Sequence, residues 1–272
     1  MSHRDRRTGP GMHRHRLGPL TRLGLALCLL WSTALTVPGH ARTPEHPDAA
    51  KTPLPMLRTA VLAPASPPDS RRLEYDILGN AGRAKYRASG VLDWRHQGST
   101  YEAQMRISAF LVGSRIQRST GRLDSTGLHP DRFVDTSRRE REARFGEVPG
   151  RITYSGSDRQ DALRPGAQDR LSVLLQLASR LNAGTPVSGQ RLEMQVAGAT
   201  GAESWEFEVV GREQVDVPAG VFPAWHVRRV ARHTDDTGLS VWLAPELQHL
   251  PVRVVLREPD GDRIEQGLRS RP

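Results

Sequence analysis

The stretch YEAQMRISA, from Tyr101 to Ala109, alternates apolar and polar residues without a break. Side chains of a β-strand point to opposite faces in turn, so a strand with one buried face shows this period of two. One face of the stretch carries Tyr101, Ala103, Met105, Ile107 and Ala109, and the other carries Glu102, Gln104, Arg106 and Ser108. We therefore predict a half-buried β-strand here.

Similar segments follow one another along most of the chain. Turn-forming runs lie between them, such as Gly79-Asn80-Ala81-Gly82 and Pro259-Asp260-Gly261-Asp262. Many strands joined by short turns form an antiparallel meander, which tends to curl and so protect its edges. We predict one all-β domain over residues 71–272, a curled sheet that forms an open or partial barrel. Its strands are predicted at residues 72–78, 85–94, 101–109, 115–124, 132–137, 141–145, 151–155, 191–196, 204–215, 222–231, 239–244, 250–258 and 263–268.

One segment, DRLSVLLQLASRL, has a helical spacing instead. Its apolar residues recur every three or four positions, at Leu171, Leu174, Leu175, Ala178 and Leu181. Asp169 suits the N-cap, and Asn182-Ala183-Gly184 ends the pattern. We predict an amphipathic helix over about residues 169–182 that buries its leucines against the concave face of the sheet or at an open barrel end.

A hairpin is predicted around the stretch EQVDVPAGVFPAWHVRR, Glu213 to Arg229. Pro218 and Gly220 suit a type I turn between two alternating segments. Beyond the turn, the alternation puts Trp225 beside Val227 on the apolar side and His226 on the opposite side. We interpret this pair as a core tryptophan and an exposed histidine of a strand, in preference to a catalytic pair.

The N-terminal region has the features of an export signal. Basic residues precede the uncharged run Leu23 to Val37, and small residues follow it up to Ala41. At 15 residues, the run is shorter than a membrane-spanning helix requires. We predict a signal peptide over residues 1–41, with Met1 or Met12 as the start, and a periplasmic location with no membrane span after cleavage. Residues 42–70 contain seven prolines and are predicted to form a flexible linker.

Composition excludes several classes of protein. Beyond residue 41 the chain holds 33 basic and 29 acidic residues, a net charge of +4, and no basic run is interleaved with aromatic residues. A nucleic-acid partner is therefore not expected. The single cysteine, Cys28, lies inside the signal peptide, so the mature chain has no disulfide and no thiolate site. We expect a monomer stabilised by its own apolar core.

Signatures of catalysis are missing from the sequence. It contains no Gly-x-Ser-x-Gly and no phosphate-binding glycine motif. We predict no catalytic residues, no metal site and no cofactor. The histidines of the domain are scattered singly, at His96, His129, His226, His233 and His249. A carboxylate pair for glycoside hydrolysis could still come together in space, and nothing in the sequence selects two among Asp93, Glu102, Asp135 and Glu206.

Several islands of sequence are similar to a known family. They are LEYDILGNAGRAKY, STGRLDSTGLHPDRF, QDRLSVLLQL, VDVPAGVFPAWHVRR and VWLAPELQHLPVRV, and they span most of residues 73–268. The chain resembles the exported bacterial proteins grouped as domain of unknown function 3108. The resemblance implies a curled β-sheet behind a signal peptide. It implies no activity, because that family has none established.

Two functions from different classes follow as hypotheses, and neither is an enzyme. In the first, the concave side of the sheet binds a lipid or another hydrophobic ligand of the envelope. Its predicted lining is Trp94, Tyr101, Met105, Trp205 and Trp225. In the second, the domain binds an envelope protein or an anionic glycan through a strand edge or an arginine-rich face. That face is predicted to hold Arg138, Arg139, Arg141, Arg228 and Arg229. A carboxylate-dependent hydrolase of envelope polymers is the third and weakest hypothesis.

Overall fold

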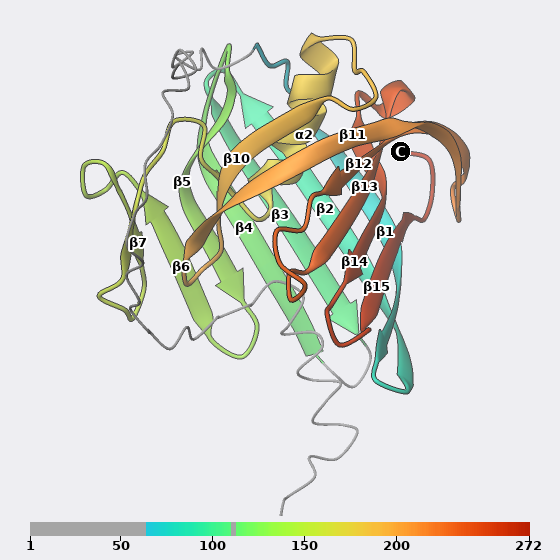
Figure 1. The fold of residues 1–272 in the computed structure, drawn as a ribbon, viewed down its shortest axis with the longest axis horizontal. Helices are drawn as coiled ribbons and strands as arrows, with labels where there is room; N and C mark the ends of the chain where they lie inside the picture. The colour runs from blue at the N-terminus through green and yellow to red at the C-terminus, as the bar shows by residue number, and fades with distance from the viewer. Residues whose placement is uncertain (1–63, 110–112) are drawn as a thin grey trace, which may run out of the picture.

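The computed structural model describes residues 64–109 and 113–272. The predicted signal peptide and most of the predicted linker lie outside these residues. The described residues form one curled sheet of fifteen strands around a single helix, α2 (Ser172–Ala183), as Figure 1 shows. The strands are β1 (Arg71–Ala81), β2 (Ala84–Gln97), β3 (Thr100–Ala109), β4 (Gly113–Asp124), β5 (Gly127–Thr136), β6 (Glu140–Phe145), β7 (Arg151–Tyr154), β8 (Gln160–Ala162), β9 (Gln168–Asp169), β10 (Arg191–Ala197), β11 (Ala202–Val217), β12 (Gly220–Arg229), β13 (Gly238–Ala244), β14 (Leu250–Arg257) and β15 (Arg263–Leu268).

The predicted antiparallel meander is confirmed. From β1 to β8 each strand pairs with the next, and the same holds from β10 to β15. The first strand, β1, also pairs with the last strand, β15, with Tyr75 facing Leu268. This pairing joins the β1–β8 half and the β9–β15 half into one sheet. The short β9 is the exception, because it runs parallel to β10 at the sheet edge. The predicted fold class, a mainly antiparallel partial barrel with one helix, is therefore correct.

The sheet is not closed, since its two ends, β8 and β9, are not paired with each other. Side chains connect the β8 end to β10 and β11 instead. The Gln195 side chain donates to the Ala162 carbonyl at 2.8 Å and accepts the Arg164 N–H at 2.9 Å, as the backbone of a neighbouring strand would. Asp161 accepts the Ala202 N–H at 2.9 Å. The edges are therefore held together without a backbone ladder.

The half-buried strand predicted over residues 101–109 is β3, and its alternation of buried and exposed side chains is confirmed. Tyr101, Ala103, Met105, Ile107 and Ala109 are all buried, and the polar residues between them are exposed or half-buried. The next strand, β4, differs because its buried face is polar. Its buried side chains are Arg115, Gln117 and Ser119, which face other polar groups inside the barrel.

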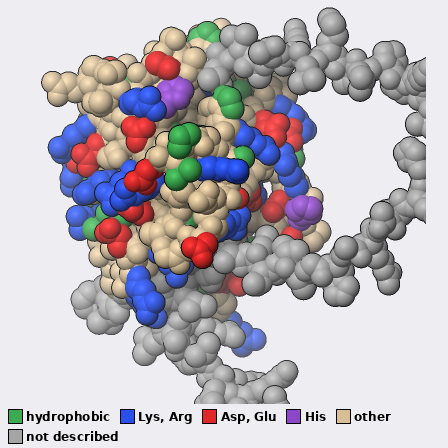
Figure 2. Space-filling view, turned by 90° about the vertical axis from the view of Figure 1, so that its left-hand side faces the viewer, with side chains coloured by type: hydrophobic (Ala, Val, Ile, Leu, Met, Phe, Trp, Pro, Cys, Tyr) green, Lys and Arg blue, Asp and Glu red, His purple; other side chains and the backbone are tan. Residues whose placement is uncertain are grey.

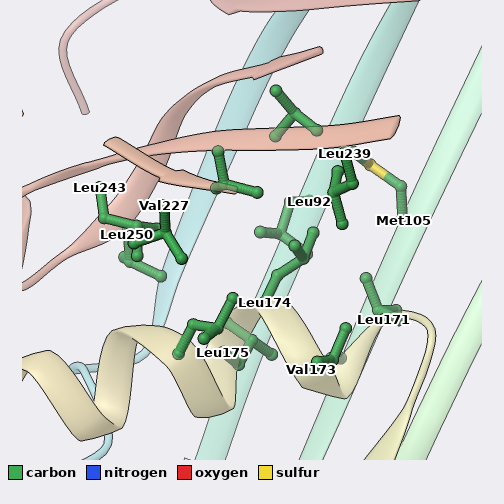
Figure 3. Packing of buried hydrophobic residues seen from close by; sticks show 14 of the residues in the cluster. Leu92, Met105, Leu171, Val173, Leu174, Leu175, Val227, Leu239, Leu243 and Leu250 are labelled. Carbon is green, nitrogen blue, oxygen red and sulfur yellow. The ribbon is translucent and has the colours of Figure 1, made fainter. Parts of the chain in front are cut away.

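Helix α2 fills much of the interior. It begins at Ser172, three residues later than predicted, because Asp169 belongs to β9 and pairs with Ala197. Asp169 still holds the N-terminal turn, since its carboxylate accepts the N–H groups of Leu171 and Ser172, each at 2.8 Å. The helix is buried on nearly all sides and not only along its leucine stripe. In Figure 3 its apolar side chains reach toward those of the surrounding strands, among them Leu92, Met105, Val227, Leu239, Leu243 and Leu250.

The predicted flexible linker ends earlier than residue 70. Residues 64–70 lie along the end of the barrel and are tied to it by hydrogen bonds. The Ala65 N–H donates to the Ser125 carbonyl, and the Ser66 N–H donates to the Ser179 carbonyl, both at 2.9 Å. The Trp94 indole N–H donates to the Pro68 carbonyl at 2.8 Å. Hydrogen bonds to the β4–β5 turn, to helix α2 and to the buried Trp94 therefore hold this segment against the barrel.

The predicted β11–β12 hairpin is present, with Val217 paired to Gly220 around Pro218-Ala219. The register places Trp225 opposite Leu243 and His226 opposite Trp242, so the two side chains do lie on opposite faces. The prediction of an exposed histidine was wrong. The His226 side chain is 19% exposed and stacks on Trp242, with ring centroids 4.5 Å apart. Trp225 is only partly buried and packs against the edge of the core.

Among the described residues, the search for a helix with the length and hydropathy of a membrane span found none.

Candidate functional site

Three of the predicted lining residues lie together in the core. Trp94 is fully buried, and its ring lies 5.6 Å from that of Tyr101, measured between centroids. Tyr101 is 4% exposed and Met105 7% exposed. Their side chains pack in the same apolar cluster as the leucines of α2. Sequence alternation thus predicted correctly that these side chains face inward. The predicted groove at this place is filled with protein side chains.

The other two predicted lining residues lie in separate places. Trp205 of β11 is 4% exposed, and the Arg229 guanidinium lies over its ring at 4.4 Å from the centroid. Arg170 lies over the same ring at 5.6 Å. Trp225 of β12 is partly buried at the margin of the core. The five residues therefore do not form one surface, although four of them are buried.

A polar network that the sequence did not predict lies beside this core. The Tyr101 hydroxyl is 2.9 Å from the Ser119 hydroxyl, which donates to the Asp169 carboxylate. Asp169 is fully buried, and burial is the largest cause that raises its pKa to about 6. Its partners Leu171 and Ser172 begin the helix turn. Because every group of this network has a partner, we interpret it as an anchor for the helix.

Arg115 and Arg170 are buried in the barrel and the Arg229 side chain is only 7% exposed, and each of the three lies beside a carboxylate. Arg115 forms a two-point contact with Asp135. Arg170 and Arg229 both contact Glu203, at 3.3 and 3.1 Å. Paired charges of this kind are costly to separate once buried. Arg229 therefore does not belong to the predicted arginine-rich surface.

The other four arginines of that predicted surface are exposed, but they lie on two separate parts of the sheet. Arg138 and Arg139 lie at the exposed turn between β5 and β6, and Arg141 is exposed near the start of β6. Arg228 is exposed on β12 and is paired with Glu208 at 2.9 Å. The spacing of these arginines along the chain did not reveal that the Arg229 side chain points away from solvent.

The four carboxylates considered for hydrolysis are each paired with an arginine. Their partners are Arg95 for Asp93, Arg118 for Glu102, Arg115 for Asp135 and Arg191 for Glu206. Each of these carboxylates is therefore engaged by a neighbouring guanidinium, whereas glycoside hydrolysis needs two carboxyl groups placed together around the scissile bond. Within residues 64–109 and 113–272 no group of three or more His, Cys, Asp or Glu has the geometry of a metal site.

The outer face of the sheet carries a stacked row across β12, β13 and β14. The His226 ring stacks on Trp242. Arg253, which pairs with Trp242 from the neighbouring strand β14, has its guanidinium over the Trp242 ring, 4.9 Å from the centroid. The Trp242 indole N–H donates to Glu213. Burial lowers the pKa of His226. The stack holds the His226 ring against Trp242 on the sheet.

A solvent-open cleft of about 700 Å³ lies near the β8 edge. We call it the arginine cleft, and it lies between β5, the end of β6 and the loop that follows β8. Its apolar floor holds Pro130, Phe145, Leu163 and Ala167, and its rim holds Arg122, Arg132, Arg144 and Arg164 together with the acids Asp131 and Glu147. Figure 2 views the side of the molecule on which the edge strands lie, where basic and acidic side chains cover much of the surface.

Acidic neighbours already contact three of the four rim arginines. Arg122 is 3.2 Å from Asp131, and Arg144 is 2.9 Å from Glu147. Arg132 and Arg144 share Glu142, whose carboxylate lies behind the rim. Contacts with arginine lower the pKa of Glu142, although burial opposes them. These pairs hold the guanidinium groups in place around the cleft.

A second open cleft, of about 720 Å³, lies on the outer face of β2 and β3. Its lining holds three arginines, Arg71, Arg72 and Arg95, against two acids, Asp93 and Glu102, a smaller surplus of arginine than in the arginine cleft. Asp93 contacts both Arg72 and Arg95. Trp94 and Tyr101 border this cleft, but their side chains are buried beneath it. The arginine cleft is therefore the stronger candidate for binding a charged ligand.

Comparison with solved structures shows the fold. The chain is similar to a β-barrel-like protein of the domain of unknown function DUF1849 from Brucella abortus, with 14% sequence identity and a TM-score of 0.50. The match covers 76% of this chain and 98% of that one. A protein with a YmcC-like fold from Bacteroides fragilis is 12% identical, and the match covers 76% of this chain and 99% of that one, with a TM-score of 0.30.

Comparison of sequences identifies the family but no activity. No curated protein matches the chain. Residues 74–267 match the family described as "Protein of unknown function (DUF3108)", which includes nearly the whole sheet and the helix. The match covers well over half of the chain and agrees with the islands of sequence quoted above. The chain belongs to the DUF3108 family of proteins of unknown function.

Proposed function

We propose that this chain is an exported, non-enzymatic binding module of the cell envelope that contacts its ligand through the outer surface of the barrel. One observation carries the proposal. Four of the five predicted interior lining residues are at most 7% exposed and belong to the apolar cluster that also holds the leucines of helix α2. The clefts open to solvent lie outside this core, and the arginine cleft has a surplus of arginine over acid.

Export and the absence of catalysis are parts of the same proposal. The basic residues, apolar run and small-residue exit before Arg42 support export. A non-enzymatic role is supported by the arginine partners of the carboxylates considered for hydrolysis. We place the mature protein in the periplasm as a monomer.

A carrier of hydrophobic ligands is the second candidate, and two observations favour it. The sheet is open, with its β8 edge held by side chains alone. The Trp205 indole N–H is buried and has no hydrogen-bond acceptor among the described residues. An acyl ligand with a polar head that entered between the edges would explain both features.

Native mass spectrometry of the full chain, expressed with its N-terminal region and purified from the periplasm, separates the two candidates. The outer-surface module predicts the mass of a polypeptide that begins at Arg42, with no bound acyl species. It also predicts that a photo-crosslinker at Leu163 captures an envelope component, whereas one at Leu78, on the distant strand β1, does not. A stoichiometric acyl adduct would favour the carrier and overturn the first proposal.

A further inference from the structure

We propose that the arginine cleft binds a small soluble molecule that carries a phosphate or carboxylate group on an apolar body. This inference rests on the proposed function and names its ligand class. The cleft volume of about 700 Å³ lies within the range of small-molecule sites, roughly 300–1,000 Å³. A stable protein partner would instead need a contact surface of about 800 Å² on each side.

The charge of the cleft selects an anion. Arg122, Arg132 and Arg144 each contact a carboxylate. Arg164 lines the cleft, and within the part of the chain that the structure describes it forms no ion pair with a rim acid, although its charge acts on the more distant Glu193. Its planar guanidinium can donate two parallel hydrogen bonds to a phosphate or carboxylate, so Arg164 is the group that would meet the ligand charge.

The backbone around Arg164 is held in place before any ligand binds. The Arg164 N–H donates to the Gln195 side chain at 2.9 Å, and its carbonyl accepts the Ala167 N–H at 3.2 Å. The neighbouring Leu163 N–H donates to the Gly150 carbonyl at 2.9 Å. A loop fixed in this way loses little conformational freedom on binding, which favours affinity.

The floor of the cleft supplies the second requirement, an apolar contact. Leu163, which is half-buried, presents most of this apolar surface, because Phe145 and Ala167 beside it are only 7% and 6% exposed. Inorganic phosphate has no apolar part, so after it binds the apolar floor would stay in contact with water. A ligand whose charged group meets Arg164 while its apolar part covers the floor uses both features, because apolar contact removes that surface from water.

The test is calorimetric titration of the purified protein with phenyl phosphate, inorganic phosphate, and vesicles that contain phosphatidylglycerol. We expect phenyl phosphate to bind more tightly than inorganic phosphate, and the vesicles not to bind. The R164Q variant should bind phenyl phosphate about tenfold more weakly, because it loses one charge-assisted contact. The R164K variant should recover little of this affinity, because an ammonium group lacks the planar fork of a guanidinium. The matched control is R138Q, which removes an exposed arginine at the β5–β6 turn, outside the cleft.

Three results would overturn the inference: equal affinities of wild type and R164Q, an equal loss in R138Q, or vesicle binding tighter than that of phenyl phosphate. The second would indicate diffuse attraction to surface charge, and the third a membrane surface as the partner. If these occur while the Leu163 crosslink to an envelope component persists, only the ligand class is wrong. An acyl adduct in native mass spectrometry would instead refute the proposed function itself.

Discussion

Replacing Leu175 by alanine tests whether helix α2 is seated inside the barrel. Leu175 is fully buried in the cluster that joins the helix to the sheet. The substitution removes three carbon groups, about 2.4 kcal/mol of transfer free energy at roughly 0.8 kcal/mol each. The cavity left behind adds to this, so we expect a loss of about 3–5 kcal/mol. That is a large part of the roughly 5–15 kcal/mol by which domains are stable.

Urea unfolding, followed by tryptophan fluorescence, measures this loss. The matched control is Leu78→Ala, the same chemical change at a strand position that is 48% exposed, where we expect a loss below about 1 kcal/mol. The midpoint of the L175A variant should fall while the slope m stays unchanged, as lost packing predicts. Equal losses in the two variants would show that the helix does not fill the interior, and the carrier hypothesis would then regain its physical basis.

Three further predictions concern the polar contacts. Because burial raises the Asp169 pKa to about 6, the native state gains stability from protonation of this group, and the gain is lost as pH rises from about 4 to 6. The D169N variant should lack up to about 3 kcal/mol of this pH dependence of the unfolding free energy, measured by urea titrations at several pH values. Parallel plots of unfolding free energy against pH for wild type and D169N would contradict the assignment. Q195A should cost about 1–2 kcal/mol and increase hydrogen exchange at the Arg164 amide, whereas unchanged protection would show that Gln195 does not hold the sheet edge. Trp94→Phe keeps an aromatic ring but removes the donor to Pro68, so limited proteolysis should cut residues 64–70 faster than in the wild type; equal rates would mean that other contacts suffice.

The sequence predicted much of the fold because alternation is a local property. The period of two in residues 101–109 determined which side chains of β3 are buried, and the spacing of Leu171, Leu174 and Leu175 indicated the helix. The same reasoning did not identify the polar interior of β4, where Arg115 lies beside Asp135, twenty residues away. An alternating pattern does not tell which partner lies opposite a charged side chain.

The candidate site required the tertiary structure for a similar reason. The arginine cleft combines residues of β5 and β6 with Arg164, whose loop is held by Gln195, thirty-one residues further along the chain. The family and the antiparallel strands could be predicted from the sequence, because each depends on neighbouring residues or on short motifs. The signal peptide stays a prediction. The tertiary structure decided that the barrel interior is filled and that its edges are held by side chains. Both depend on contacts between distant segments, which local periodicity does not encode.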